Sequence, residues 1–168
     1  MGEANNIVLI GMPGAGKSSM GVVAAKMLGM DFIDCDLLIQ GRFDRTLARI
    51  IDEAGAEGFI EIENEVLRDI ECENTVIATG GSAVYSEEAM AHLKAMGTVV
   101  YLQVSLEELK DRLGELAERG VVMRGECNSL EDLYAERLPL YERWANITIS
   151  VDNTSIREAA ETLVNTLQ

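Results

Sequence analysis

Near the start of the chain, eight residues carry the types and spacing of a phosphate-binding loop. The segment Gly11–Ser18, GMPGAGKS, matches G-x-x-x-x-G-K-[ST] and lies between an apolar run and a helical pattern, which is the context that the motif requires. In such a loop backbone N–H groups surround a phosphate. Lys17 would contact the β- and γ-phosphates, and the Ser18 hydroxyl would bind Mg²⁺. The alternative is a glycine-rich turn that binds nothing. The motif predicts ATP and Mg²⁺ as cofactors, bound by Gly14, Ala15, Gly16, Lys17, Ser18 and Ser19.

Two carboxylates follow a short apolar stretch in Asp34-Cys35-Asp36. Side chains at i and i+2 point the same way while a chain stays extended, so one carboxylate would reach Mg²⁺ and the other an acceptor substrate. The alternative is an acidic helix start with Asp36 as the N-cap. Because no acidic residue closes the apolar stretch Thr75–Thr79, we assign Asp34 to the Mg²⁺ site.

A pair of glycines, Gly80 and Gly81, ends the apolar stretch Thr75–Thr79. Adjacent glycines allow the backbone to approach a ligand closely and to present its N–H groups. The alternative is an ordinary turn, where glycine is common. This segment therefore becomes a candidate part of the acceptor site.

The basic residues of the second half are Arg112, Arg119, Arg124, Arg137 and Arg143. Exposed arginines on acidic helices are usually only solvated. Arg119 differs because it lies within 114–129, a stretch with three glycines that we expect to be mobile. An arginine delivered by a closing loop can neutralise charge on a transferring phosphoryl group.

The elements that must position these residues alternate along the chain. Strand patterns occur at Ile7–Ile10, Asp31–Asp34, Thr75–Thr79, Thr98–Leu102 and Ile147–Val151. Helical patterns occur near 17–28, 46–54, 57–71, 86–96, 105–118, 129–143 and 155–167. This alternation predicts an α/β fold with a parallel sheet and helices on both faces, and ligands at the carboxyl ends of the strands.

Composition narrows the class of protein. The 168 residues suit a single domain over 1–168, and the net charge of −15 argues against nucleic acid as a partner. Three cysteines and one histidine without metal-ligand spacing argue against zinc and favour a reducing cytoplasm. No apolar run is long enough to span a membrane, and from the polar residues before Ile7 we expect no signal peptide. We expect a cytoplasmic monomer with no membrane partner.

Taken together, these motifs resemble those of the shikimate kinases, small phosphate-loop kinases of the nucleoside-monophosphate-kinase type. The similarity extends from Ile7 to about Leu167 and is carried by the phosphate loop, F-I-D-C-D, G-F-x-x-x-E around Phe59 and Glu63, T-G-G-S-A-V, R-G-V-V and R-L-P-L-Y. The resemblance implies a five-stranded parallel sheet with helices on both faces. It also implies an acceptor-binding region over about 35–62 and a lid over about 114–128.

The resemblance also implies roles for single residues. The residues implied to be catalytic are Lys17, Asp36, which would orient the acceptor hydroxyl, and Arg119, the lid arginine. Those implied to bind the acceptor are Asp36, Gly80, Gly81 and Arg137, with Arg137 on the acceptor carboxylate. Nucleotide contacts beyond the phosphate loop would come from Arg119 and from Arg112, which would pack on adenine. Metal binding would fall to Ser18 and Asp34.

The chain departs from the family pattern in the acceptor region. Family members carry F-R-x-x-E, whose arginine is one of two that bind the shikimate carboxylate, whereas this chain has Ile60 there. Ser82 also replaces the third glycine of a G-G-G turn. A charge-assisted hydrogen bond contributes about 1.5–3 kcal/mol, so its loss would lower affinity roughly 10–150-fold. Arg137 would then hold the carboxylate alone, or with help from Arg124 or backbone N–H groups.

The sequence therefore predicts a kinase that transfers the γ-phosphoryl group of ATP to a hydroxyl of a small carboxylated metabolite. Shikimate, giving shikimate 3-phosphate, is the first choice of acceptor. Ile60 keeps another small hydroxy acid, such as homoserine, as an alternative. A further alternative is a nucleotide-binding protein without catalysis. That alternative is opposed by the joint presence of Lys17, Ser18, Asp34, Asp36, Arg119 and Arg137.

Overall fold

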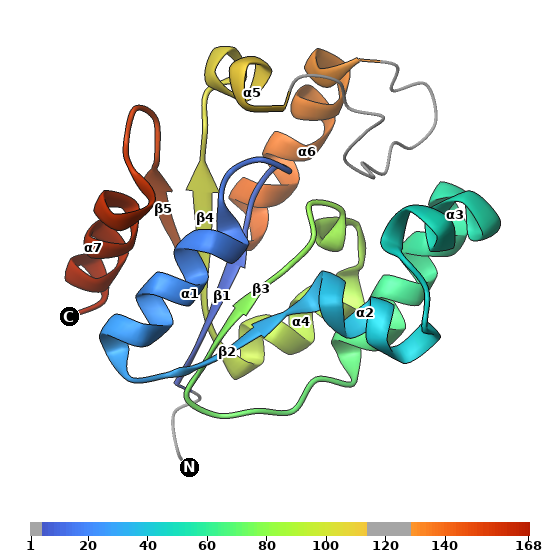
Figure 1. Cartoon of the computed structure of the whole chain (residues 1–168), viewed down its shortest axis with the longest axis horizontal. Helices are drawn as coiled ribbons and strands as arrows, with labels where there is room; N and C mark the ends of the chain where they lie inside the picture. Colours follow the sequence, from blue (N-terminus) through green and yellow to red (C-terminus); the bar gives the residue numbers. More distant parts are fainter. Residues whose placement is uncertain (1–4, 114–128) are drawn as a thin grey trace.

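The computed structural model describes residues 5–113 and 129–168, and within them five parallel strands form one sheet in the order β2-β3-β1-β4-β5 (Figure 1). The strands are β1 (Asn6–Ile10), β2 (Asp31–Asp34), β3 (Thr75–Ala78), β4 (Gly97–Gln103) and β5 (Ile147–Ser150). All of β1 is buried, because it lies between β3 and β4 and is covered on both faces. The predicted five-stranded parallel sheet is confirmed.

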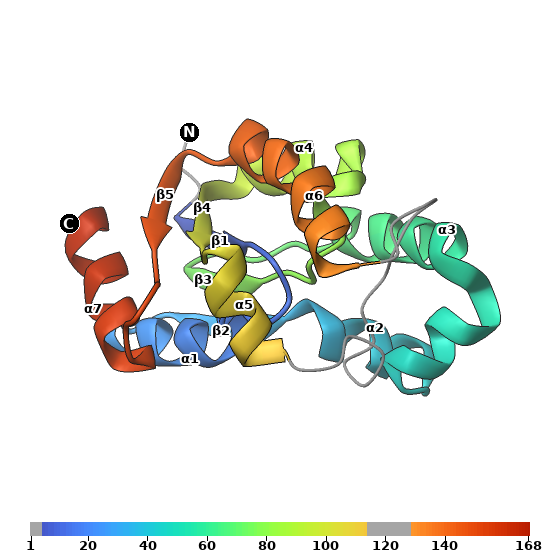
Figure 2. The same cartoon turned by 90° about the horizontal axis from the view of Figure 1, so that it is seen from above.

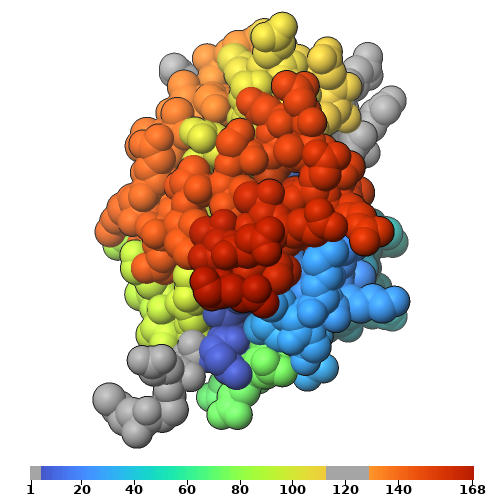
Figure 3. Space-filling view, turned by 90° about the vertical axis from the view of Figure 1, so that its left-hand side faces the viewer, coloured from blue at the N-terminus to red at the C-terminus, as the bar shows by residue number. Residues whose placement is uncertain are grey.

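Helices cover both faces of this sheet, as predicted (Figures 1 and 2). Helices α1 (Lys17–Leu28) and α7 (Ile156–Leu167) lie side by side on one face, and Figure 3 shows α7 packed beside α1 at the surface. Helices α4 (Glu87–Met96) and α6 (Leu130–Trp144) cover the other face. Helix α5 (Leu106–Leu113) follows β4, and the rest of the helix predicted over 105–118 lies outside the described residues.

Strand β1 delivers the phosphate loop to the centre of the sheet. Its residues pair with β3 on one side and with β4 on the other, in parallel register. The chain runs from β1 to β2 and β3 on one side and later to β4 and β5 on the other. In open α/β sheets ligands bind where the strand order reverses in this way. The loop after β1 therefore opens at the expected place for a ligand.

One helix corrects the expectation for Asp34-Cys35-Asp36. The chain does not stay extended after β2, because α2 (Cys35–Phe43) begins at once. Asp34 is the N-cap, and its Oδ1 accepts hydrogen bonds from the backbone N–H groups of Asp36, at 2.9 Å, and Leu37, at 3.3 Å. The alternative interpretation, an acidic helix start with Asp36 as the N-cap, correctly predicted a helix. It was wrong about the cap, since Asp36 lies in the first turn.

Helix α3 (Leu47–Arg68) joins the two patterns predicted over 46–54 and 57–71 and ends before residue 71. The boundary between the patterns corresponds to a kink at Gly55, whose φ of 75° and ψ of 172° are not helical. With α2 it extends beyond the sheet (Figures 1 and 2). A small separate core of Ile39, Ile50, Phe59 and Val66 joins the two helices. This core fixes the position of side chains that α2 and α3 direct toward the phosphate loop.

Candidate active site

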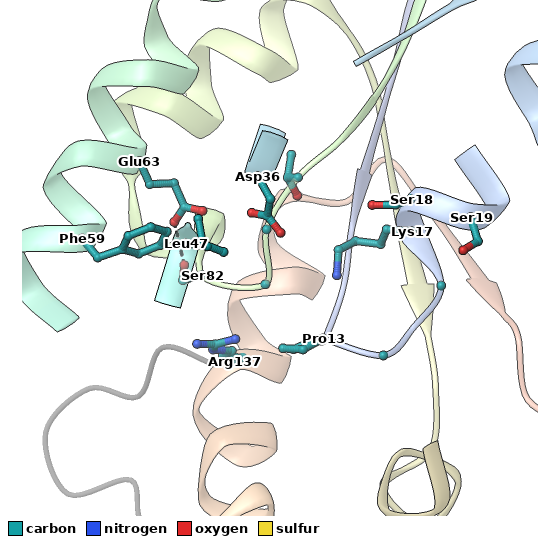
Figure 4. Close-up of a pocket in the computed structure, with 15 residues that line it drawn as sticks. Pro13, Lys17, Ser18, Ser19, Asp36, Leu47, Phe59, Glu63, Ser82 and Arg137 are labelled. Atoms are coloured by element: carbon teal, nitrogen blue, oxygen red, sulfur yellow. Dashed lines mark hydrogen bonds between the residues drawn. The ribbon is translucent and has the colours of Figure 1, made fainter. Parts of the chain in front are cut away.

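A cavity of about 400 Å³ opens at the carboxyl ends of β1 and β3 (Figure 4). Its walls come from the phosphate loop, the first turn of α2, both halves of α3, the glycine turn after β3, and α6. These segments are far apart in the sequence, and the sheet brings them together. Among the predicted site residues, those that line the cavity are Gly14, Gly16, Lys17, Ser18, Ser19, Asp36, Gly80, Gly81 and Arg137.

The phosphate loop has the backbone shape that its glycines permit. Gly14 and Gly16 adopt φ values of 85° and 90°, in the region that favours glycine. Lys17 Nζ donates to the carbonyl oxygens of Gly11, at 2.7 Å, and Met12, at 2.9 Å. Only 8 % of Lys17 is exposed, and burial lowers its pKa to about 8 even though Asp36 acts in the opposite direction. The loop thus presents an ammonium group at the base of the cavity.

Ser18 and Asp34, the two predicted metal ligands, lie in direct contact. The Ser18 hydroxyl donates to Asp34 Oδ2 at 2.7 Å. Mg²⁺ usually keeps several waters and takes few protein oxygens beside substrate phosphates. A hydroxyl and one carboxylate next to a phosphate loop fit that chemistry. Among the described residues no cluster of three His, Cys, Asp or Glu side chains could hold a metal ion.

Asp36 points into the cavity from α2 and faces both Lys17 and the glycine turn (Figure 4). Burial raises the pKa of this carboxyl, and the charge of Lys17 opposes the rise. A Cβ added to Gly80 would lie 2.9 Å from Asp36 Oδ1, so the glycine leaves room beside the carboxylate. The two catalytic residues predicted within the described part of the chain are therefore neighbours in one cavity.

Arg137 closes the cavity from α6. It is 1 % exposed, its Nε donates to the Tyr85 hydroxyl at 3.3 Å, and its guanidinium lies 5.3 Å from the centre of the Tyr85 ring. A Cβ at Gly81 would lie 2.8 Å from its Nη1. The Tyr141 hydroxyl fixes the same turn by donating to the Gly81 carbonyl at 2.7 Å. The arginine is thus a buried cation aimed at the glycine turn.

Sequence reasoning assigned no role to the acid that lines the cavity beside Ser82. Glu63 of α3 is 0 % exposed, and its Oε1 accepts a hydrogen bond from the Ser82 hydroxyl at 2.7 Å. Burial raises the Glu63 pKa to about 7, and the Ser82 hydrogen bond opposes the rise. The sequence feature that could have indicated a role for Glu63 is its spacing from Phe59. Residues four apart share one face of a helix, and these two both line the cavity.

Arg112 lies behind the phosphate loop. Its guanidinium donates to the carbonyl oxygens of Gly14 at 3.2 Å, Ala15 at 3.4 Å and Val151 at 3.1 Å, and pairs with Glu108 at 3.0 Å. These contacts join the loop to the end of β5. Packing of Arg112 on adenine stays a prediction. Ala15 is buried and does not line the cavity.

Three further expectations concern the lid, Ile60 and membrane spans. The lid over about 114–128, with Arg119 and Arg124, lies outside the described residues. Ile60 is partly buried against the small core of α2 and α3 and does not line the cavity. No described helix is both long enough and apolar enough to cross a membrane.

Comparison with known proteins gives one consistent result. A family model described as shikimate kinase matches residues 13–168. A shikimate kinase of Vibrio cholerae is 39 % identical over 171 residues, which cover 100 % of this chain and 98 % of the relative. A structure of shikimate kinase from Acinetobacter baumannii in complex with shikimate is 31 % identical, with a TM-score of 0.88, and covers 97 % of this chain and 92 % of that one.

A second structure, shikimate kinase from Aquifex aeolicus, has a TM-score of 0.83 and 31 % identity, and covers 96 % of this chain and 95 % of that one. The family match and the relatives extend over nearly all of both chains, so the resemblance inferred from the motifs is confirmed. With its phosphate loop, Asp36 and Arg137 gathered around one cavity, this chain belongs to the shikimate kinase family.

Proposed function

We propose that this chain transfers the γ-phosphoryl group of ATP to a hydroxyl of shikimate, giving shikimate 3-phosphate. The observation that carries the proposal is the convergence of Lys17, Asp36 and Arg137 on one cavity next to the phosphate loop. One end of this cavity suits phosphates, and the other suits a small carboxylated acceptor. Membership of the family supports the same reaction.

At the phosphate end, the chain supplies positive charge and backbone donors. The Lys17 ammonium, held by two loop carbonyls, would exchange these contacts for oxygens of the transferring phosphoryl group. The N–H groups at the start of α1 favour an anion at the same place. Ser18 and Asp34 would hold Mg²⁺, which when bound supplies charge neutralisation on the phosphates.

At the acceptor end, Asp36 would accept a hydrogen bond from the attacking hydroxyl and aim its oxygen at the phosphoryl group. Loose phosphoryl-transfer transition states require orientation more than early deprotonation, so the carboxylate can take the proton late. Arg137 would bind the acceptor carboxylate, helped by the fixed turn at Gly80 and Gly81. The region over about 35–62 would thereby act as the acceptor-binding region.

The remaining roles complete the proposal. Arg119 would be supplied by a lid over about 114–128, and Arg112 would support the loop while it packs on adenine. The free thiols of Cys35 and Cys72 are compatible with a reducing cytoplasm, where we place the enzyme as a monomer. Homoserine is not favoured as the acceptor, because the family model and the relatives are shikimate kinases and because Ile60, the residue that suggested homoserine, does not line the cavity.

The test is ATP turnover with shikimate and with homoserine, measured as ADP release in a coupled assay. We expect shikimate-dependent turnover that requires Mg²⁺ and is lost in Lys17→Ala. The matched control is Lys26→Ala, which removes an exposed lysine from the far end of the same helix. Turnover of homoserine with none of shikimate would refute the proposed acceptor.

A further inference from the structure

The acceptor end of the cavity has few cationic side chains for a carboxylate. Among the described residues that line it, the cationic side chains are Lys17 and Arg137. Lys17 belongs to the phosphate loop, where two carbonyls hold it. An acceptor carboxylate has four lone-pair sites and is costly to bury with only part of them filled. Beside Arg137 and the backbone N–H groups of the glycine turn, any further side-chain donor among the described residues must come from a residue other than arginine.

Glu63 is placed to be that group. Its Oε1 is occupied by the Ser82 hydroxyl, whereas its Oε2 is buried and has no hydrogen-bond partner among the described residues. A Cβ at Gly80 would lie 2.8 Å from Oε2, so this oxygen faces the space that the glycine leaves open. Figure 4 shows Glu63, Asp36 and Arg137 around that space. A buried polar atom without a partner is rare, and one that faces the cavity is available to a ligand.

We propose that Glu63 binds the acceptor in its protonated form, with the Oε2–H group donating a hydrogen bond to the acceptor carboxylate while Arg137 binds the same carboxylate from α6. The proposal rests on the proposed function, because it assumes an anionic acceptor. The Ser82 hydroxyl leaves Oε1 as an acceptor and so directs the proton to Oε2. No covalent step is involved, and a proton is taken up with the ligand by those molecules in which Glu63 was ionised.

The surroundings of Glu63 make protonation attainable near neutral pH. The carboxyl is buried, which raises its pKa to about 7 against the attraction of two cations. An arriving carboxylate adds a second negative charge nearby and raises that pKa further. The charged or titratable groups around Glu63 come from α1, α2 and α6 and are Lys17, Cys35, Asp36, Arg137 and Tyr141.

The first test is the pH dependence of shikimate affinity, measured by calorimetry on the full-length protein between pH 6 and pH 9. If only the protonated form binds, the dissociation constant rises roughly fivefold from pH 7 to pH 8 and about tenfold per further pH unit. In Glu63→Gln the amide donates at every pH, so the affinity should be nearly flat and should exceed that of the wild type at pH 9. Glu61→Gln, an exposed change on the same helix, should keep the wild-type profile.

The second test needs no variant. Titrations in buffers of different ionisation enthalpy report protons taken up with shikimate, and we expect about half a proton at pH 7 and nearly one at pH 8. Binding without proton uptake would overturn the proposal. A pH dependence that Glu63→Gln retains would also overturn it, because the titrating group would then be Asp36 or Lys17. Weaker binding by Glu63→Gln at every pH would overturn it as well, because Glu63 would then accept a hydrogen bond from a hydroxyl of the ligand. If the wild type does not bind or turn over shikimate at any pH, the proposed function fails as well.

Discussion

Replacing Glu63 with glutamine should stabilise the protein at high pH and much less at low pH. The Glu63 pKa is raised from its ordinary value of 4.5 to about 7 in the folded chain, mainly by burial. A raised carboxyl pKa means that stability is greatest below pH 4.5 and is lost as the pH rises through 7. At 1.36 kcal/mol per pKa unit the full cost is about 3 kcal/mol, of which about 2.5 kcal/mol arises between pH 5 and pH 8.

The measurement is the free energy of unfolding from urea titrations of the wild type and Glu63→Gln at pH 5 and pH 8. Glutamine keeps the shape and the bond from Ser82, so the difference between the two proteins isolates the titration. We expect that difference to favour Glu63→Gln by about 2–3 kcal/mol more at pH 8 than at pH 5. Glu61→Gln serves as the exposed control. Equal differences at the two pH values would show that Glu63 ionises in the folded protein as it does in water, and would refute the reasoning.

Three further predictions concern activity. Lys17→Ala should lower kcat at least about a hundredfold, as loss of a charge-stabilising donor does, and near-normal kcat would contradict the phosphate-loop assignment. Asp36→Asn should lower kcat strongly at any Mg²⁺ concentration, whereas Asp34→Asn should mainly raise the Mg²⁺ requirement; equal Mg²⁺ titration curves would show that these roles are wrongly divided. Gly80→Ala places a Cβ 2.8 Å from Glu63 Oε2. It should raise the shikimate KM roughly tenfold through overpacking, and an equal rise in the KM for ATP would contradict a purely acceptor-side effect.

Features that depend on short stretches of sequence could be predicted. The phosphate loop is a contiguous motif, and the central strands β1 and β3 are apolar runs whose burial on both faces removes any need for alternation. Helix α2 was harder to predict, because Leu37 is apolar yet 63 % exposed, so the apolar residues of this helix do not mark its buried face. The N-cap role of Asp34 could not be assigned from the sequence, because it depends on α2 beginning at Cys35.

The acceptor side of the site depends on contacts between distant segments. Glu63 and Arg137 are charged residues on helical patterns, and charged residues are seldom fully buried. Their burial follows from the packing of α3 and α6 around the glycine turn after β3. The departure at Ile60 was predicted to disturb the acceptor pocket, but no local pattern shows that this side chain packs against the small core of α2 and α3 and does not line the cavity.

Asp34 contacts a different element with each of its two oxygens. Oδ1 accepts from the first turn of α2, and Oδ2 accepts from Ser18 in the first turn of α1. The helix cap and the contact with Ser18 depend on different properties of this residue. The cap fixes its length, since glutamate would reach past the N–H groups of α2, while asparagine would satisfy the cap. The cation site proposed beside Ser18 would fix its charge, since asparagine offers only a neutral oxygen there. Aspartate alone among the acidic and amide side chains meets both conditions, so the two demands together, and neither one by itself, would preserve this residue.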